Sequence, residues 1–188
     1  MERYVAIEKI LQQVEADDLV LTTTGMPSRE AFVADDRPGN FYMIGSMGLL
    51  SSLGLGLALL NRDRHVIVID GDGSALMSLG TIPLISYEAP RNLYYIILDN
   101  AAYESTGGQP CISGKIDLGN IVRSAGFHRV ESVENTEVLE RILKQTLAQE
   151  GPVCIHAHVE ISRVKGIPRV SHSPEEIRDR FRKHVGSS

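Results

Sequence analysis

The segment HVIVIDGDGS, residues 65–74, is the strongest indication of the fold of this chain. Its apolar half is short and rich in β-branched residues, which is typical of a strand that is buried on both faces of a parallel sheet. A second run of this kind, LYYIIL at residues 93–98, leads into Asp99 and Asn100. Asp72 and Asn100 therefore follow the carboxyl ends of two adjacent strands, where open α/β sheets bind ligands. Their carboxylate and amide oxygens are suitable ligands for a hard cation that also holds phosphate oxygens.

Strands alternate with helices along the whole sequence, which predicts a doubly wound parallel α/β sheet flanked by helices, in one domain over residues 1–188. The expected strands are residues 18–23, 65–69, 93–99, 127–130 and 153–159. The expected helices are residues 2–14, 28–33, 46–60, 75–87, 117–125, 136–150 and 175–184. We expect Ser28 to cap a helix, Pro83 to kink or offset one, and residues 35–40 and 101–115 to form loops.

Composition excludes several classes of protein. The net charge of −5 gives no electrostatic footprint for nucleic acid. Cys111 and Cys154 have no CxxC spacing, so we expect reduced thiols in a cytoplasmic protein without a signal peptide. The apolar stretch 43–60 is slightly short for a membrane span and is dense in small residues, which favours a buried helix.

Nucleotide-binding motifs are weak in this chain. A dinucleotide-binding fold needs GxGxxG between a strand and a helix, whereas Gly54 and Gly56 lie inside an apolar helical run that lacks the third glycine. The sequence contains no GxxxxGK[ST] motif either.

Several other polar residues have simple interpretations. His156 and His158 share one face of a predicted strand, but no third metal ligand is evident. The basic residues after that strand, Arg163, Lys165 and Arg169, are predicted to form a solvated tail rather than a sulfonate clamp. No pattern assigns Arg29, Arg37 or Arg91 to an anion.

The Gly-Asp-Gly turn, the segment 74–99 and the turn at Asn100 resemble the signature of the thiamine diphosphate enzymes. The resemblance implies that Asp72, Asn100 and the main-chain carbonyl of Ala102 bind Mg²⁺, which bridges to the diphosphate of the cofactor. Asp99 stands where many members have a first Asn, and Ala102 where many have Gly. Neither difference removes a side-chain ligand.

The resemblance extends to other parts of the cofactor site. Gly45-Ser46-Met47-Gly48 is similar to a family motif in which a hydrophobic residue bends the cofactor and a glycine carbonyl holds its 4′-amino group. Met47 and Gly45 would have these two roles in catalysis, and Gly73 and Ser74 would offer N–H groups to the diphosphate at a helix N-terminus. The implied cofactor-binding residues are Thr24, Gly25, Gly45, Ser46, Met47, Gly71, Asp72, Gly73, Ser74, Asn100, Ala102, Tyr103, Ser105 and Thr106.

In this family a glutamate from a separate pyrimidine-binding domain contacts the cofactor, and this chain is long enough for only one of the two domains. The resemblance therefore implies an alpha subunit as partner in a hetero-oligomer, with homo-oligomers possible for the isolated chain.

Residues 23–30, 37–43 and 105–109 resemble the phosphonopyruvate and sulfopyruvate decarboxylases. A free-standing diphosphate half is most similar to the beta subunits of split sulfopyruvate decarboxylases, which act in coenzyme M biosynthesis. The implied substrate is an anionic 2-keto acid. Glu104 departs from the Gly that we expect before Ser105. The alternatives are a phosphonopyruvate decarboxylase, an acetolactate synthase-like subunit, and a non-catalytic scaffold subunit.

Overall fold

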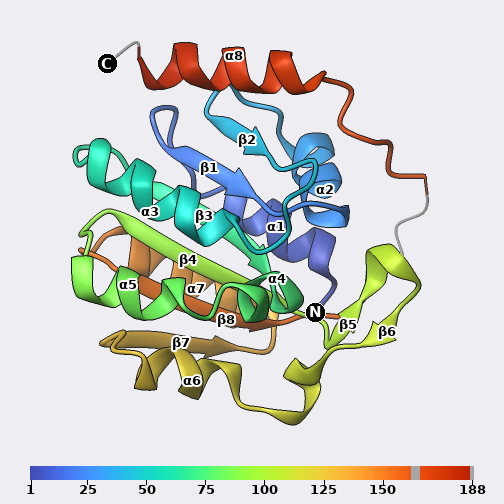
Figure 1. Cartoon of the computed structure of the whole chain (residues 1–188), viewed down its shortest axis with the longest axis vertical. Helices are drawn as coiled ribbons and strands as arrows, with labels where there is room; N and C mark the ends of the chain where they lie inside the picture. Colours follow the sequence, from blue (N-terminus) through green and yellow to red (C-terminus); the bar gives the residue numbers. More distant parts are fainter. Residues whose placement is uncertain (162–165, 187–188) are drawn as a thin grey trace.

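The sheet has six parallel strands in the order β2-β1-β3-β4-β8-β7 (Figure 1). The computed structural model describes residues 1–161 and 166–186. The strands are β1 (Leu19–Thr22), β2 (Asn40–Tyr42), β3 (Val66–Gly71), β4 (Leu93–Asp99), β7 (Arg129–Val133) and β8 (Val153–His158). A separate antiparallel pair consists of β5 (Ala102–Tyr103) and β6 (Gln109–Pro110). The two apolar runs in the sequence are the adjacent strands β3 and β4, and the predicted fold class is confirmed.

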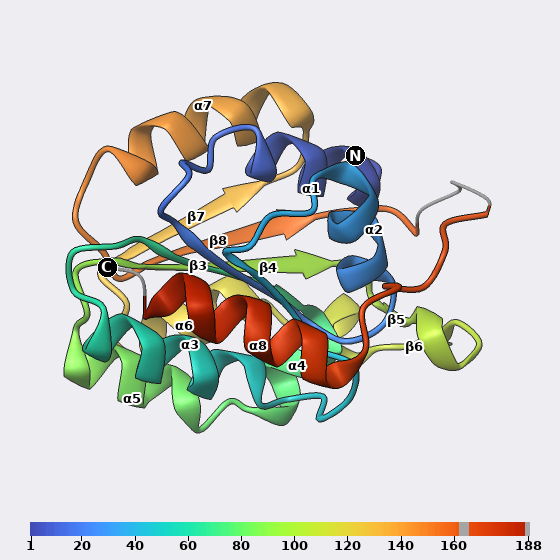
Figure 2. The same cartoon turned by 90° about the horizontal axis from the view of Figure 1, so that it is seen from above.

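Helices cover both faces of the sheet (Figure 2). One face packs against α1 (Arg3–Leu11), α2 (Met26–Ala34) and α7 (Thr136–Leu147). The other packs against α3 (Leu50–Leu60), α4 (Asp72–Met77), α5 (Thr81–Glu88) and α6 (Leu118–Ser124). The last helix, α8 (Pro174–Val185), lies along the edge strand β2.

Successive side chains of β3 enter the two cores in alternation. Ile67 and Ile69 pack on the α1 side, whereas Val66 and Val68 pack on the α3 side, and all four are fully buried. Each such side chain contributes about 1.5–3 kcal/mol by leaving water. The sheet is therefore a rigid support for the loops that follow its strands.

The order of the strands reverses next to β1. The chain places β2 on one side of β1 and then returns to place β3 on the other side. The connections that leave β1 and β3 therefore diverge to opposite sides of the sheet, and this opens a crevice at the carboxyl ends of these strands. Asp72 follows β3 at this crevice, and Asn100 follows the neighbouring β4.

Several predicted boundaries were wrong for local reasons. The end of the predicted loop at 35–40 leads into β2, a strand of only three residues at the edge of the sheet. The helix predicted from 46 begins at Leu50, because Ser46 (φ 55°) and Gly48 (φ 91°) adopt left-handed backbone. The strand expected at 127–130 is β7, which starts two residues later.

The helix predicted over 75–87 is divided into α4 and α5. Pro83 has no N–H and its ring would clash with the carbonyl of Leu79 in a continuous helix, so the chain turns at 78–80 before α5 begins. Ser28 does not cap a helix, since α2 starts at Met26 with Gly25 as the N-cap residue. Its hydroxyl instead donates to the carbonyl oxygen of Thr23 at 2.7 Å.

The apolar stretch 43–60 is only partly buried. No helix in the described part of the chain is long and apolar enough to cross a membrane. α3 has 11 residues, and its outer side exposes Leu53 and Leu60, which corrects the expectation of a buried helix. Cys111 and Cys154 are buried free thiols.

Candidate functional site

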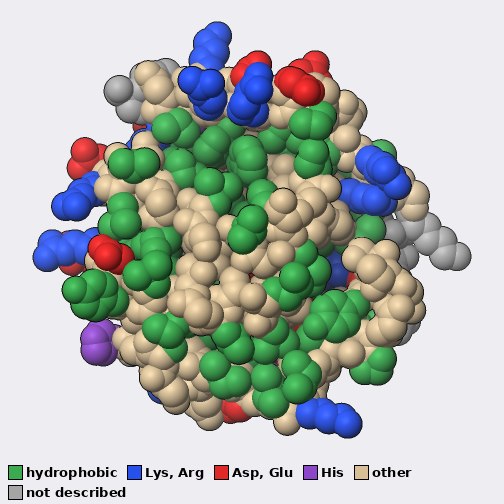
Figure 3. All heavy atoms as spheres, in the orientation of Figure 1, with side chains coloured by type: hydrophobic (Ala, Val, Ile, Leu, Met, Phe, Trp, Pro, Cys, Tyr) green, Lys and Arg blue, Asp and Glu red, His purple; other side chains and the backbone are tan. Residues whose placement is uncertain are grey.

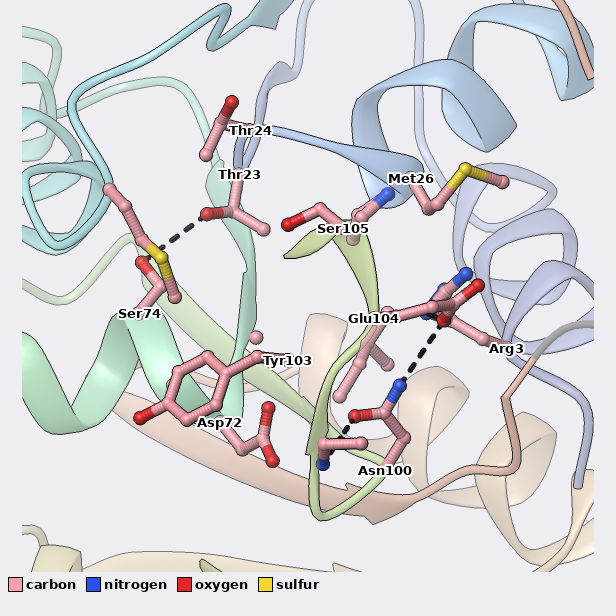
Figure 4. A pocket seen from close by; sticks show the side chains of 16 residues that line it. Arg3, Thr23, Thr24, Met26, Asp72, Ser74, Asn100, Tyr103, Glu104 and Ser105 are labelled. Carbon is pink, nitrogen blue, oxygen red and sulfur yellow. Dashed lines mark hydrogen bonds and ion pairs between the residues drawn. The ribbon is translucent and has the colours of Figure 1, made fainter. Parts of the chain in front are cut away.

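A cavity of about 70 Å³ lies at the carboxyl ends of β1, β3 and β4 (Figure 4). Its floor comes from the ends of these strands, and its rim from α1, the start of α2 and the segment after Asn100. The lining residues are Arg3, Thr23, Thr24, Met26, Pro27, Met47, Gly71, Asp72, Gly73, Ser74, Leu98, Asn100, Ala102, Tyr103, Glu104 and Ser105. Most of the predicted cofactor-binding residues are therefore brought together.

Asp72 and Asn100 face the same space within this cavity (Figure 4). The Asn100 amide is held at both ends, because its Oδ1 accepts from the N–H of Ala102 at 3.1 Å and its Nδ2 donates to Glu104 at 3.4 Å. The oxygen keeps a lone pair for another ligand. Burial raises the pKa of the Asp72 carboxyl, and a hydrogen bond from Ser113 lowers it in part. A cation beside Asp72 would stabilise its charged form.

A buried hydrogen-bond network lies behind Asp72. The Ser113 hydroxyl is 2.7 Å from Asp72 Oδ2 and 2.9 Å from Asp99 Oδ1. Asp99 Oδ2 lies 2.9 Å from His156 Nε2. Burial alone would raise the pKa of Asp99, but hydrogen bonds from His156, the Ala101 N–H and Ser113 bring it down to about 2. The network fixes the direction in which the Asp72 carboxylate points.

His158 lies beside this network on the same strand face as His156. The two imidazole rings are 4.4 Å apart, and ligand atoms of Asp99, His156 and His158 lie within 4.8 Å of one another. The possible third metal ligand, which was not evident from the sequence, is thus Asp99. The pairing of β4 with β8 places Asp99 opposite His158. Because His156 is already hydrogen-bonded to Asp99, we interpret this cluster as part of the network that orients Asp72 and not as a metal site.

Asp99→Asn should be a mild substitution. The amide oxygen of the new side chain would still accept from Ala101 and Ser113, and its NH₂ group would lie where the His156 ring nitrogen can accept from it. Calorimetric affinity for thiamine diphosphate in the presence of Mg²⁺ should stay within about threefold of the wild type. A loss of more than about tenfold would mean that the Asp99 charge itself takes part in binding.

The glycines of the Gly-Asp-Gly turn have different roles. A Cβ on Gly73 would stand 2.4 Å from the Tyr103 ring and 3.0 Å from Met47 Cε, so glycine is needed for these side chains to pack there. A Cβ on Gly71 would meet only Thr23, at 3.9 Å. Packing within the chain does not require glycine at 71, and its missing side chain leaves space in the cavity.

Ser74 connects the turn at 45–48 to the end of β1. Its hydroxyl accepts from the Gly48 N–H at 3.1 Å and from Thr23 at 3.3 Å. α4 has only six residues and therefore a small dipole, so an anion-binding role of Gly73 and Ser74 rests on their N–H groups. Met47 is half-buried at the cavity wall.

The remaining predicted residues lie outside the cavity lining, at its edge. Gly45 and Ser46 are exposed beside Met47, and no atom lies within 4 Å of the position of a Cβ on Gly45. Gly25 faces Ser105, whose Cβ would be 3.6 Å from a Cβ at that glycine. Thr106 also does not line the cavity, because its hydroxyl donates to Gln109 at 2.9 Å within the hairpin loop.

Sequence reasoning missed the part of the rim formed by Arg3 and Glu104. Arg3 is 4% exposed and binds Glu30 through two hydrogen bonds, of 2.8 and 2.9 Å. It also forms an ion pair with Glu104, which in turn accepts from Asn100. Glu104 therefore links α1 to the Asn100 amide, which gives the departure from Gly a structural role. No local signal indicates this link, because the two residues are 101 positions apart.

Arg3→Ala should lower the free energy of unfolding by about 3–5 kcal/mol, because it leaves the fully buried Glu30 carboxylate without its partner. Urea denaturation of the isolated chain measures this loss. Arg178→Ala is a matched control, since it breaks an exposed pair with Asp179 and should have little effect. Equal losses in the two variants would contradict the importance of the buried pair.

Sequence comparison places the chain in a family. Residues 24–157 match the family described as thiamine pyrophosphate enzyme, C-terminal TPP binding domain. The chain belongs to the thiamine pyrophosphate enzymes. The matched range contains every predicted cofactor-binding residue, from Thr24 to Thr106. Members of this family bind thiamine diphosphate, also called thiamine pyrophosphate.

Two relatives differ in how much of their own length this chain covers. It is 42% identical over 185 residues to the sulfopyruvate decarboxylase subunit beta of Methanothermobacter thermautotrophicus, covering 98% of this chain and 96% of that protein. It is 38% identical over 183 residues to the phosphonopyruvate decarboxylase of Streptomyces viridochromogenes, covering 97% of this chain and 46% of that protein. The chain thus spans about half the length of that phosphonopyruvate decarboxylase.

A solved structure supports the fold. The 2-oxoglutarate:ferredoxin oxidoreductase of Magnetococcus marinus superposes with a TM-score of 0.72 over 96% of this chain and 74% of its own, at 14% identity. At this level of identity the likeness concerns the fold alone.

Proposed function

We propose that this chain is the diphosphate-binding subunit of a heteromeric, thiamine diphosphate- and Mg²⁺-dependent decarboxylase that converts 3-sulfopyruvate to sulfoacetaldehyde and CO₂. The observation that carries the proposal is the 42% identity over 96% of a sulfopyruvate decarboxylase beta subunit, a protein of matching length. Asp72 and Asn100 lie at the carboxyl ends of β3 and β4, close to the crevice where the strand order reverses, and this arrangement supports the proposal.

The donors in the cavity suit Mg²⁺ and a diphosphate. Asp72, Asn100 and the Ala102 carbonyl offer oxygen ligands of the kind that this ion prefers. Glu104 holds the amide of Asn100, and Ser113 holds the carboxylate of Asp72. When bound, thiamine diphosphate supplies the electron sink for decarboxylation. The role of this chain is then to bind and orient the diphosphate, and to place Met47 against the bend of the cofactor.

Met47→Ala should lower turnover more than cofactor affinity. The Met47 side chain would select the bent form of the cofactor, while the ligands around Asp72 carry most of the binding. In the assembled enzyme we expect kcat to fall about 10-fold or more, with the Kd for thiamine diphosphate within about threefold. A large loss of affinity with unchanged kcat of the loaded enzyme would reverse the assignment.

Two features support a partner subunit. The cavity of about 70 Å³ is far smaller than the roughly 300–1,000 Å³ of complete small-molecule sites, so this chain encloses only a part of the cofactor. Several large apolar side chains are exposed, and Figure 3 shows hydrophobic groups spread over the face that carries α3 and α5. They include Ile44 and Leu49, which flank Met47 in the sequence, and Met77 at the end of α4. A second chain bound here would cover them and complete the site.

Phosphonopyruvate is the second candidate substrate. The phosphonopyruvate decarboxylase of Streptomyces viridochromogenes is 38% identical over 97% of this chain. The two substrates differ only in whether the anionic group on C3 is a sulfonate or a phosphonate. An acetolactate synthase-like subunit and a non-catalytic scaffold are the remaining alternatives.

A substrate panel tests the proposal. The chain is purified together with its partner subunit, loaded with thiamine diphosphate and Mg²⁺, and assayed for CO₂ release from 3-sulfopyruvate, phosphonopyruvate and pyruvate. We expect the highest kcat/KM with 3-sulfopyruvate. A higher value with phosphonopyruvate would select the second candidate, and a complex that binds cofactor but releases no CO₂ would support a scaffold.

A further inference from the structure

A second cavity, of about 300 Å³, lies next to the cofactor site. The two cavities share Thr24, and Ile44 on the wall of the second precedes Gly45 in the chain. Its lining residues are Thr24, Gly25, Ser28, Arg29, Met43, Ile44, Arg169 and Val170. No acidic residue is among them, although the chain as a whole has a net charge of −5.

Two arginines from distant parts of the sequence meet at this cavity. Arg29 is half-buried on α2, and Arg169 belongs to the segment that leads to α8. Within residues 1–161 and 166–186, neither guanidinium forms an ion pair or a side-chain hydrogen bond. Two guanidinium groups without counter-ions at one cavity repel each other, and an anion bound between them would offset this repulsion.

The other arginines that the sequence left open are engaged elsewhere. Arg37 donates to the carbonyl oxygens of Ala16 and Asp18, at 3.1 and 3.4 Å. Arg91 pairs with Glu150 at 3.3 Å. Neither lines the second cavity, so position and pairing together separate Arg29 and Arg169 from them. Arg163 and Lys165 lie outside the described residues.

We propose that Arg29 and Arg169 bind the anionic group on C3 of the substrate, a sulfonate or phosphonate attached to a methylene carbon. A guanidinium presents a planar fork of N–H donors that matches two oxygens of such a group. Met43 and Ile44 would flank the methylene carbon, and the shared Thr24 would put this group beside a cofactor bound in the first cavity. This inference rests on the proposed function, and it differs from the sequence-based interpretation of Arg169 as part of a solvated tail.

The test uses the assembled enzyme with Arg29→Gln, Arg169→Gln and Arg29→Lys. Each Gln variant should raise the KM for 3-sulfopyruvate about 10-fold or more, with kcat and the Kd for thiamine diphosphate within about threefold. Arg29→Lys should recover part of the loss, because it keeps the charge without the fork. Arg141→Gln is the matched control, an exposed arginine on α7 without a described ion pair, and should leave KM unchanged.

The outcomes separate this inference from the proposed function. If the wild-type enzyme prefers phosphonopyruvate, the proposed substrate is wrong, and the same rise in KM must then appear with phosphonopyruvate. If the wild type turns over 3-sulfopyruvate and both Gln variants keep its KM, the proposed function stands and the anion site is overturned. Arg169 is exposed, so Arg169→Gln can be assayed even if substitution of Arg29 impairs folding.

Discussion

Asp72→Ala in the assembled enzyme should abolish Mg²⁺-dependent binding of thiamine diphosphate, with a loss of affinity of about 100-fold or more. Asp72 is the acidic side chain that lines the described cavity at the end of β3, and the other one in the lining, Glu104, is already paired with Arg3. Without it, Asn100 and the Ala102 carbonyl would offer only neutral oxygens to the ion. Asn100→Ala should be similarly damaging.

Calorimetric titration with thiamine diphosphate at saturating Mg²⁺ measures this loss. Asp72→Asn is a control for folding, because it removes the charge while keeping the volume and an acceptor for Ser113. Both variants should remain folded and assembled, and both should bind the cofactor weakly. Near-normal affinity in Asp72→Ala would show that the metal ion is held elsewhere.

The isolated chain should not decarboxylate any 2-keto acid, even at saturating thiamine diphosphate and Mg²⁺. Its cavity of about 70 Å³ could enclose only a small part of the cofactor, and the residues that would face the remainder, such as Gly45 and Ser46, are exposed. The family resemblance implies that the glutamate for the pyrimidine ring would come from the proposed partner subunit. No described acidic side chain that lines this cavity can replace it, since Asp72 is assigned to the metal and Glu104 to Arg3 and Asn100.

Steady-state turnover of the purified chain on 3-sulfopyruvate measures this inactivity. Mass spectrometry of the preparation is the control against traces of a partner. Self-association is expected under these conditions, because the apolar side chains around Ile44 and Leu49 remain exposed. Robust turnover in a preparation without a second chain would mean that no partner subunit is needed.

The features that the sequence predicted correctly depend on local patterns. The runs that form β3 and β4 contain only residues that suit a strand buried on both faces, so their position in the centre of the sheet follows directly. Asp72 and Asn100 then come together because parallel strands end at the same edge. The alternation of strands and helices decides the rest of the fold class.

The features that the sequence did not predict depend on contacts between distant segments. β2 has three residues and is a strand only because β1 pairs with it. Arg3, at the start of the chain, reaches Glu104 through the packing of α1 on α2. Arg169 approaches Arg29 because α8 returns to the edge of the sheet. Short periodic patterns contain no information on such contacts.

The decarboxylation rate of 3-sulfopyruvate during a titration of this chain with its partner subunit shows whether the two chains together form the active enzyme. Thiamine diphosphate and Mg²⁺ are kept saturating, and the amount of complex is measured in the same samples. We predict no turnover without the partner, and a rate that rises in proportion to the complex formed until this chain is fully bound. Full activity before any partner is added, or no activity at full assembly, would contradict an active site shared between two chains.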